Sequence, residues 1–186
     1  MKKALLIVGM IMAVMMVVQP TYAANQGTFN ITVTISSFSM ELMKHDGMAM
    51  YNDWAITVPP GGAITMVAND AVMVSLTGDI GTNGVDVVTF VQNSHSWHAV
   101  MPDPGNPLQN NDFVLLADLM LAEPADNGQP LSLANPRPIT DVTEMPLGMI
   151  PGGQDKAWVI YSLQFGTQYD NPQENIEVVI EAKLKP

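Results

Sequence analysis

The amino-acid sequence predicts an all-β protein, a single antiparallel β-sandwich of about eight to ten strands. Three observations lead to this prediction: apolar and polar residues alternate in short segments, turn-forming residues separate those segments, and no long segment has helical periodicity. Alternation places the apolar side chains on one face of a strand. Two sheets must then pack against each other so that both apolar faces are buried.

Individual strands are predicted from the pattern of apolar residues. Alternation from Phe29 to Ile35 and from Ile176 to Leu184 is typical of strands with one solvated face. Two other segments are apolar on both faces, which suits central strands covered from both sides: residues 113–120 and 157–161. Turns rich in Gly, Pro and Asn separate the shorter strands expected at residues 55–58, 64–67, 72–76, 85–91 and 97–101.

Two segments are harder to interpret. Residues 39–54 form either a short helix, because Met40 and Met43 lie three positions apart, or an irregular crossing between the sheets. Residues 123–149 contain five prolines. Because proline cannot donate to a strand ladder, we expect a long ordered loop there with one or two short edge strands.

The first 23 residues have the pattern of a secretion signal peptide. Lys2 and Lys3 precede the apolar run Ala4–Val18, and small residues at Ala23 and Ala24 suit a cleavage point. The apolar run would form a helix of roughly 22 Å, shorter than the ~30 Å hydrocarbon layer that a membrane span must cross. We therefore expect residues 1–23 to be removed on export, and residues 24–186 to form one domain outside the cytoplasm.

The composition excludes several kinds of site and partner. The sequence has no cysteine, so it contains no disulfide, no lipid-modified cysteine and no thiolate metal site. Without Lys2 and Lys3, five basic side chains accompany 18 acidic ones, which gives a formal charge of −13. This charge argues against nucleic acid and anionic membrane surfaces as partners.

The C-terminal part of the sequence has a recognisable arrangement. The turn at residues 150–153 (Ile-Pro-Gly-Gly) precedes Trp158 and Phe165, and the alternating strand 176–180 follows. This arrangement resembles the last hairpin of immunoglobulin-like modules in bacterial surface and secreted proteins. With the first strand and the segment 111–115, the resemblance extends over most of residues 24–186. It implies an immunoglobulin-like sandwich that serves display, assembly or adhesion.

Signatures of catalysis are missing from the sequence. It has no Gly-x-Ser-x-Gly or His-Glu-x-x-His motif, no phosphate-binding glycine loop and no dinucleotide-binding fingerprint. The paired carboxylates Glu177 and Glu181 lie on one face of the predicted last strand, and a solvated outer face explains them better than glycosidase chemistry does. We therefore expect that the protein is not an enzyme.

Methionine and histidine gather in one short segment of the sequence. The residues that could bind a soft metal there are Met40, Met43, His45, Met48 and Met50. Thioether and imidazole ligands suit Cu(I), whereas methionine also fills irregular gaps in protein cores. We favour packing over copper binding, because the spacing matches no fixed ligand geometry.

A second candidate metal site is a possible calcium loop with oxygen ligands at Asp79, Asn83 and Asp86. Gly81 and Phe90 stand where further ligands belong, and the Asn-Gly pair is typical of a plain hairpin turn, which we favour. His95 and Trp97 are expected on one face of a strand and His98 on the other, so the two histidines do not converge.

We therefore expect an exported, non-catalytic structural or interaction module of the cell surface or extracellular space, with a protein partner or a second copy of itself. One alternative is a periplasmic copper-binding β-domain that uses the Met40–Met50 segment. Another is a carbohydrate-binding module that uses Trp97 or Trp54. No cofactor is expected apart from these copper and calcium candidates.

Overall fold

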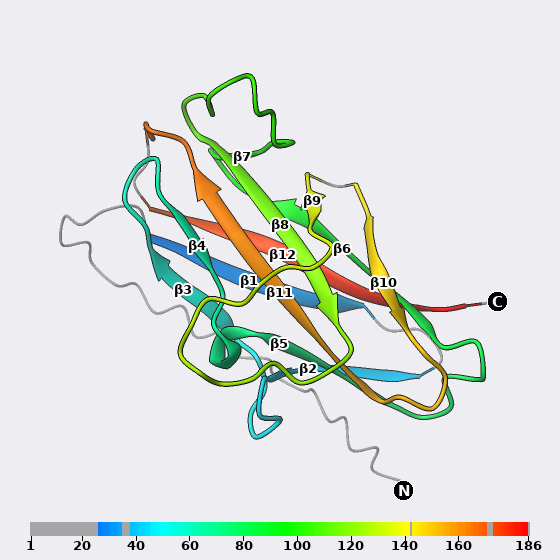
Figure 1. The fold of residues 1–186 in the computed structure, drawn as a ribbon. Coiled ribbons are helices and arrows are strands. Elements are labelled where there is room, and N and C mark those ends of the chain that lie inside the picture. The colour runs from blue at the N-terminus through cyan, green and yellow to red at the C-terminus, as the bar shows by residue number, and fades with distance from the viewer. Residues whose placement is uncertain (1–25, 35–37, 142, 171–172, 186) are drawn as a thin grey trace, which may run out of the picture.

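The computed structural model describes residues 26–34, 38–141, 143–170 and 173–185, so the predicted signal peptide lies outside the described residues. The structure confirms the predicted β-sandwich, with two sheets packed together (Figure 1). Within the described residues, the strands and one short 3₁₀ helix are β1 (Gln26–Thr34), β2 (Ser39–Lys44), β3 (Asp53–Thr57), β4 (Ala63–Thr65), η1 (Ala68–Asp70), β5 (Val72–Thr77), β6 (Val85–Asn93), β7 (His98–Ala99), β8 (Asp112–Met120), β9 (Arg137–Ile139), β10 (Met145–Ile150), β11 (Lys156–Phe165) and β12 (Gln173–Leu184).

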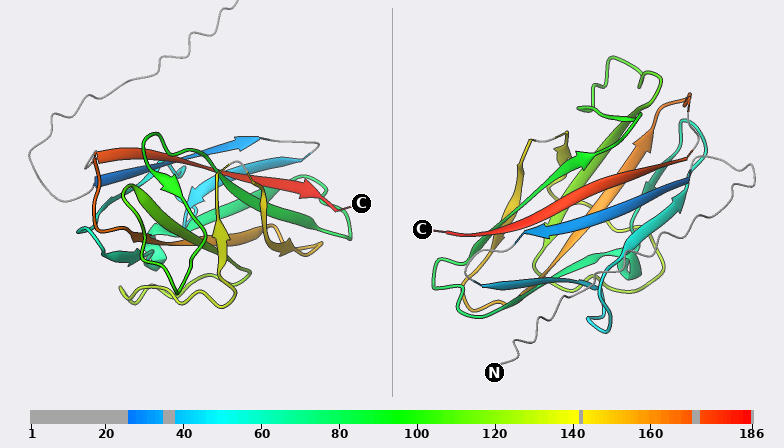
Figure 2. Two further views of the ribbon diagram at one scale, coloured as in Figure 1. Left: turned by 90° about the horizontal axis from the view of Figure 1, so that it is seen from above. Right: turned by 180° about the vertical axis from the view of Figure 1, so that it is seen from behind.

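Sheet A has the strand order β10-β6-β12-β1-β3. All its neighbours are antiparallel except β1 and β12, which run parallel with Phe29 opposite Ile176 and Val33 opposite Ile180. Sheet B has the order β2-β5-β11-β8-β7, and two further short strands each have one partner in it, β4 pairing with β11 and β9 with β8. In Figure 2 (left), the blue β1 and red β12 lie in one layer and the orange β11 lies in the other.

The core lies between the two sheets. The hydroxyls of Thr89 in β6 and Tyr161 in β11 are 3.0 Å apart, so Tyr161 points from sheet B toward sheet A. Because strand residues alternate, Val159 and Leu163 point the same way, and both are fully buried. Strand β11 is also buried on its outer face, at Trp158 and Ile160. This agrees with the prediction that its sequence belongs to a central strand covered on both faces.

A strap formed by residues 121–136 covers the outer face of sheet B (Figure 2, left). The N–H of Leu131 donates to the carbonyl of Met66 at 2.9 Å. The buried carboxylate of Asp118, on β8, accepts the N–H of Leu119 and the N–H of Asn135, both at 2.9 Å. Asp118 therefore fixes the end of the strap, and two backbone donors compensate for the burial of its charge.

The structure corrects the helix considered for residues 39–54. This segment contains strand β2, a turn and the start of β3. Met40 is buried against the core, while Met43 is only partly buried on the opposite face of the strand, so their spacing of three is a consequence of strand alternation. The predicted strand 97–101 shortens to His98–Ala99, because residues 94–97 form a turn closed by the bond from the Trp97 N–H to the Ser94 carbonyl.

The count of strands is also higher than predicted. Twelve strands are present in the described ranges. Strands β9 and β10 confirm the one or two short edge strands expected in the proline-rich segment, and β2 is the strand that the sequence does not predict. In these same ranges we find no helix that has the length and apolar character needed to cross a membrane.

Candidate interaction surface

Of the four strands at the ends of the two sheet orders, three are protected against pairing with another chain, and the strands β4 and β9, which also have one partner each, are only three residues long. On β10, Pro146 offers no N–H, and the register shifts between Pro146 and Gly148. The last three residues of β2 are covered by the segment that follows them, through bonds from Lys44 N–H to the Ala49 carbonyl at 2.7 Å and from Tyr51 N–H to the Leu42 carbonyl at 2.9 Å. Strand β7 is only two residues long.

The fourth edge, β3, is open. Strand β3 pairs with β1 through five residue pairs, and across the described part of the chain no strand pairs with its other side. Trp54 and Ile56 are buried, whereas Asp53, Ala55 and Thr57 are exposed, so the strand is held in an extended conformation by its apolar face. An edge of this kind presents backbone N–H and C=O groups that can pair with a further strand.

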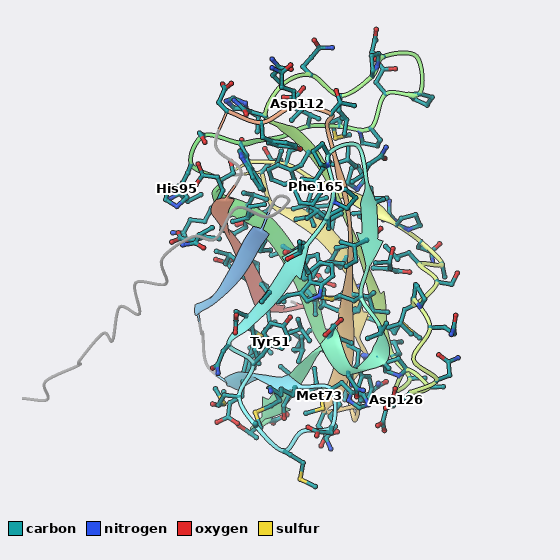
Figure 3. The ribbon with its side chains drawn as sticks, turned by 90° about the vertical axis from the view of Figure 1, so that its left-hand side faces the viewer. Tyr51, Met73, His95, Asp112, Asp126 and Phe165 are labelled. Atoms are coloured by element: carbon teal, nitrogen blue, oxygen red, sulfur yellow. The ribbon has the colours of Figure 1, made fainter. Side chains whose placement is uncertain are left out.

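An aromatic cluster supports the loops at one end of the sandwich (Figure 3, near Asp112 and Phe165). The ring of Trp97 is fully buried and lies 5.4 Å from Phe165, 6.5 Å from Phe113 and 4.7 Å from Tyr169, measured between ring centroids. Edge-to-face contacts of this kind add to the stabilisation from burial. The cluster joins residues from three separate chain segments, around residues 97, 113 and 165–169, into one rigid base.

Hydrogen bonds connect the loops above this base. The hydroxyl of Tyr169 donates to the Asp112 carbonyl at 2.5 Å and accepts the N–H of Gly166 at 2.8 Å. Asn111, in a left-handed conformation at φ 64°, donates to the Asp170 carboxylate and accepts the Asp170 N–H, both at 2.9 Å. Burial raises the pKa of Tyr169 to about 12, so this hydroxyl remains protonated at neutral pH.

A proline-rich loop at residues 102–108 lies beside the aromatic end and closes one side of a pocket of about 560 Å³. Val114 and Gln164, on the outer face of sheet B, form its floor. Asp103 organises the loop by accepting the N–H of Gly105 at 3.0 Å and the side-chain amide of Asn106 at 2.6 Å. These two bonds hold the pKa of Asp103 below its usual value. The loop is thus exposed to solvent, and its own hydrogen bonds hold its backbone in one conformation.

Two histidines and two aspartates, His95, His98, Asp112 and Asp141, lie near this end of the sandwich. His98 Nδ1 lies 3.9 Å from the Asp112 carboxylate, and burial raises the pKa of Asp141, which lies 3.4 Å from the Ser94 hydroxyl. His95 is exposed in the turn that replaces the predicted strand, so it does not converge with His98. No group of three or more His, Asp or Glu side chains is placed to hold a metal ion, as far as the described side chains extend.

The residues of the predicted copper site separate in the structure. Met40 is buried in the core, Met43 is partly buried on the other face of β2, and Met48 is 86% exposed at the tip of the turn. His45 Nε2 lies 3.9 Å from the Glu123 carboxylate, and the His45 carbonyl accepts the indole N–H of Trp158 at 3.1 Å. Only Met50 forms a backbone bridge with Met43. The five predicted residues therefore do not form one cluster.

The predicted calcium loop is the turn between β5 and β6. The carboxylate of Asp79 accepts the N–H of Gly81 at 2.8 Å, and Asp86 lies within β6 opposite Lys183. At Gly84, with φ 76°, an added Cβ would lie 2.2 Å from the Ile150 carbonyl oxygen. The glycine is thus explained by a close backbone approach. The predicted hairpin is wrong, because β5 lies in sheet B and β6 lies in sheet A, so the turn connects the two sheets.

The tryptophans considered for carbohydrate binding are both buried, Trp54 at 4% and Trp97 at 0% exposure. Neither ring offers the exposed face that stacking against a sugar requires, which argues against the alternative of a carbohydrate-binding module. Glu177 and Glu181, the carboxylates considered for glycosidase chemistry, are partly exposed on β12. The carboxylate of Glu181 lies 3.3 Å from the Lys183 ammonium.

A scan against the models of known protein families finds no match, and a search of curated protein sequences finds no significant similarity. The functional proposal therefore depends on the edges, loops and side chains described above.

Proposed function

We propose that the protein is an exported, non-catalytic structural module, an immunoglobulin-like β-sandwich that assembles with copies of itself through the edge strand β3. The observation that supports this most directly is the contrast among the four sheet edges. Proline, a covering segment or shortness protects β10, β2 and β7, whereas β3 combines an open edge with a firmly buried inner face. Export and removal of residues 1–23 remain part of the proposal.

Edge pairing would extend sheet A by main-chain hydrogen bonds, with exposed side chains at alternate positions of β3 setting the fit. The acidic charge of the chain opposes this contact, because copies that each carry a net charge of −11 or more negative repel one another. At 0.1 M ionic strength, salt largely screens this repulsion between charges more than about 10 Å apart. Assembly should therefore increase with salt concentration.

The test uses the chain without residues 1–23, followed by light scattering and electron microscopy at low and high salt. Ala55 is exposed on β3, and a lysine there is the kind of edge charge that prevents strand pairing. Thr82→Lys makes the same charge change in an exposed turn and serves as the control. We expect large species from the unmodified chain and Thr82→Lys, and monomers from Ala55→Lys. A chain that stays monomeric at high salt, or equal assembly of both variants, would refute the proposal.

A further inference from the structure

Three methionines occupy neighbouring positions on the outer face of sheet B. Met50 forms an antiparallel bridge with Met43, and Met43 in β2 lies opposite Met73 in β5. Residues that are opposite one another in a sheet point to the same face. The row continues with Trp158, which lies opposite Met73 in β11. Tyr161 of β11 points inward, toward sheet A. Trp158 is three positions away on the same strand and therefore points to the outer face, together with the methionines opposite it.

The pairing pattern brings Met43 and Met50 especially close. Hydrogen bonds flank the pair on both sides, from Lys44 N–H to the Ala49 carbonyl and from Tyr51 N–H to the Leu42 carbonyl. The pair itself is therefore of the non-hydrogen-bonded kind, in which Cα atoms are about 4.5 Å apart and side chains approach most closely. Met73 lies on the other side of Met43, in the neighbouring strand, and adjacent strands are about 4.8 Å apart. Three flexible thioether side chains at these positions can bring their sulfurs together without backbone movement.

The row runs from solvent into the protein. Met50 is 53% exposed, Met43 is partly buried and Met73 is 4% exposed. The turn at Gly47, with φ 70°, closes over Met73, whose terminal methyl and sulfur lie 3.1 and 3.8 Å from the position that a Cβ at Gly47 would take. The side chain of Met73 is labelled in Figure 3. Packing accounts for Met73 and Met43, but a half-exposed Met50 contributes little to the core.

We propose that Met43, Met50 and Met73 bind one Cu(I) ion through their three thioether sulfurs. Neutral, soft thioethers select Cu(I) over harder cations, and the chain has no cysteine that would compete for it. The acidic charge of the chain favours a cation. This site goes beyond the proposed assembly function and is independent of β3. It also differs from the site expected from sequence, since Met73 takes the place of Met40.

The test is anaerobic competition for Cu(I) between the chain lacking residues 1–23 and a chromogenic Cu(I) chelator. We expect one Cu(I) per chain. Each of Met43→Leu, Met50→Leu and Met73→Leu should weaken retention at least about tenfold, the loss typical of changing even an outer-shell partner of a metal. Leucine is close to methionine in volume, so the fold should survive, and thermal melting checks this. Met101→Leu, at an exposed methionine elsewhere, is the matched control.

A second readout is independent of the chelator. Trp158 adjoins Met73 across the strands, so its fluorescence should be quenched when Cu(I) or redox-stable Ag(I) binds, and the quenching should disappear in Trp158→Phe. Failure of the unmodified chain to retain Cu(I), or full retention by a variant with all three leucines, would overturn the proposal and leave the methionines as packing residues. Ala55→Lys should bind Cu(I) normally, so failure of assembly and failure of metal binding are distinguishable.

Discussion

Removing one hydroxyl from the interior should stabilise this protein. The hydroxyl oxygen of Tyr51 is buried and has no hydrogen-bond partner among the described residues. Folding therefore removes this polar group from water without replacing its hydrogen bond, which costs about 1–3 kcal/mol. Tyr51→Phe keeps the ring and eliminates that cost, so we expect the free energy of unfolding to rise by about 1–3 kcal/mol. For a domain of this size, the melting temperature should rise by roughly 2–4 °C per kcal/mol.

Tyr161→Phe provides the opposite case in the same core. The Thr89 hydroxyl donates to the Val179 carbonyl at 2.7 Å, so Tyr161 is the donor in the 3.0 Å bond between the two hydroxyls. Removing the Tyr161 hydroxyl deletes one satisfied bond, and we expect a loss of about 0.5–1.5 kcal/mol. The same chemical change at two buried tyrosines should thus have opposite effects on stability.

The pH dependence should follow from these two residues and from Tyr169, because burial raises the pKa of all three hydroxyls. Burial raises the pKa of Tyr51 and of Tyr161 well above the value of about 10 that tyrosine has in an unfolded chain. Above pH 10 the unfolded state loses these protons while the folded state keeps them, so stability falls as pH rises through this range. Each group contributes a slope of up to about 1.4 kcal/mol per pH unit. The slope should be smaller in Tyr51→Phe.

Urea denaturation at pH 7 and at several values above pH 10 measures both effects, with tryptophan fluorescence as the signal. The urea dependence of the unfolding free energy should be the same in all variants, since the surface exposed on unfolding is unchanged. Destabilisation of Tyr51→Phe at pH 7, or an alkaline slope equal to that of the unmodified chain, would show that the Tyr51 hydroxyl is not an unsatisfied buried group.

Three further substitutions test the packing of the sandwich and its loops. Trp97→Ala removes the central ring of the aromatic cluster and should cost about 3–5 kcal/mol in urea denaturation, whereas an effect below 1 kcal/mol would contradict its position. Gly84→Ala should lower the melting temperature strongly, because its Cβ would meet the Ile150 carbonyl oxygen at 2.2 Å, while Gly81→Ala, with open space around it, should lower it much less. Asp103→Ala should speed protease cleavage at residues 102–108 without changing the melting temperature, and unchanged cleavage would show that its two bonds do not order the loop.

The sandwich could be predicted from sequence because burial of one strand face leaves a direct trace in the residue pattern. The strand at residues 176–184 and the continuous apolar strands at 113–120 and 157–161 appear at their predicted places, extended by a few residues at their ends. The ends differ because backbone pairing continues beyond the apolar pattern, as in β11, where exposed Gln164 still pairs with Val114.

The candidate surfaces could not be predicted, because they depend on pairing between distant segments. Nothing in the sequence connects Met73 with Met43, which lie 30 positions apart and become neighbours only through the register of β2 and β5. The edge of β3 is likewise open because no other strand of the described chain pairs with its outer side, and the residues of β3 alone do not reveal this. The burial of Trp97 depends on Phe113, Phe165 and Tyr169, three residues from later parts of the chain. Local patterns carry no information on such contacts.

The segment between β2 and β3 links the two proposals physically. Its first half returns along β2 and covers that edge, which places Met50 beside Met43 and puts Tyr51 against the core. Its second half crosses to sheet A and begins β3, whose outer side pairs with no strand of the described chain. A metal that fixed Met50 would therefore also restrain the segment that leads into β3. Cu(I) binding should then slow hydrogen exchange at residues 49–54 without altering exchange in β12, and equal exchange with and without Cu(I) would show that the two surfaces are independent.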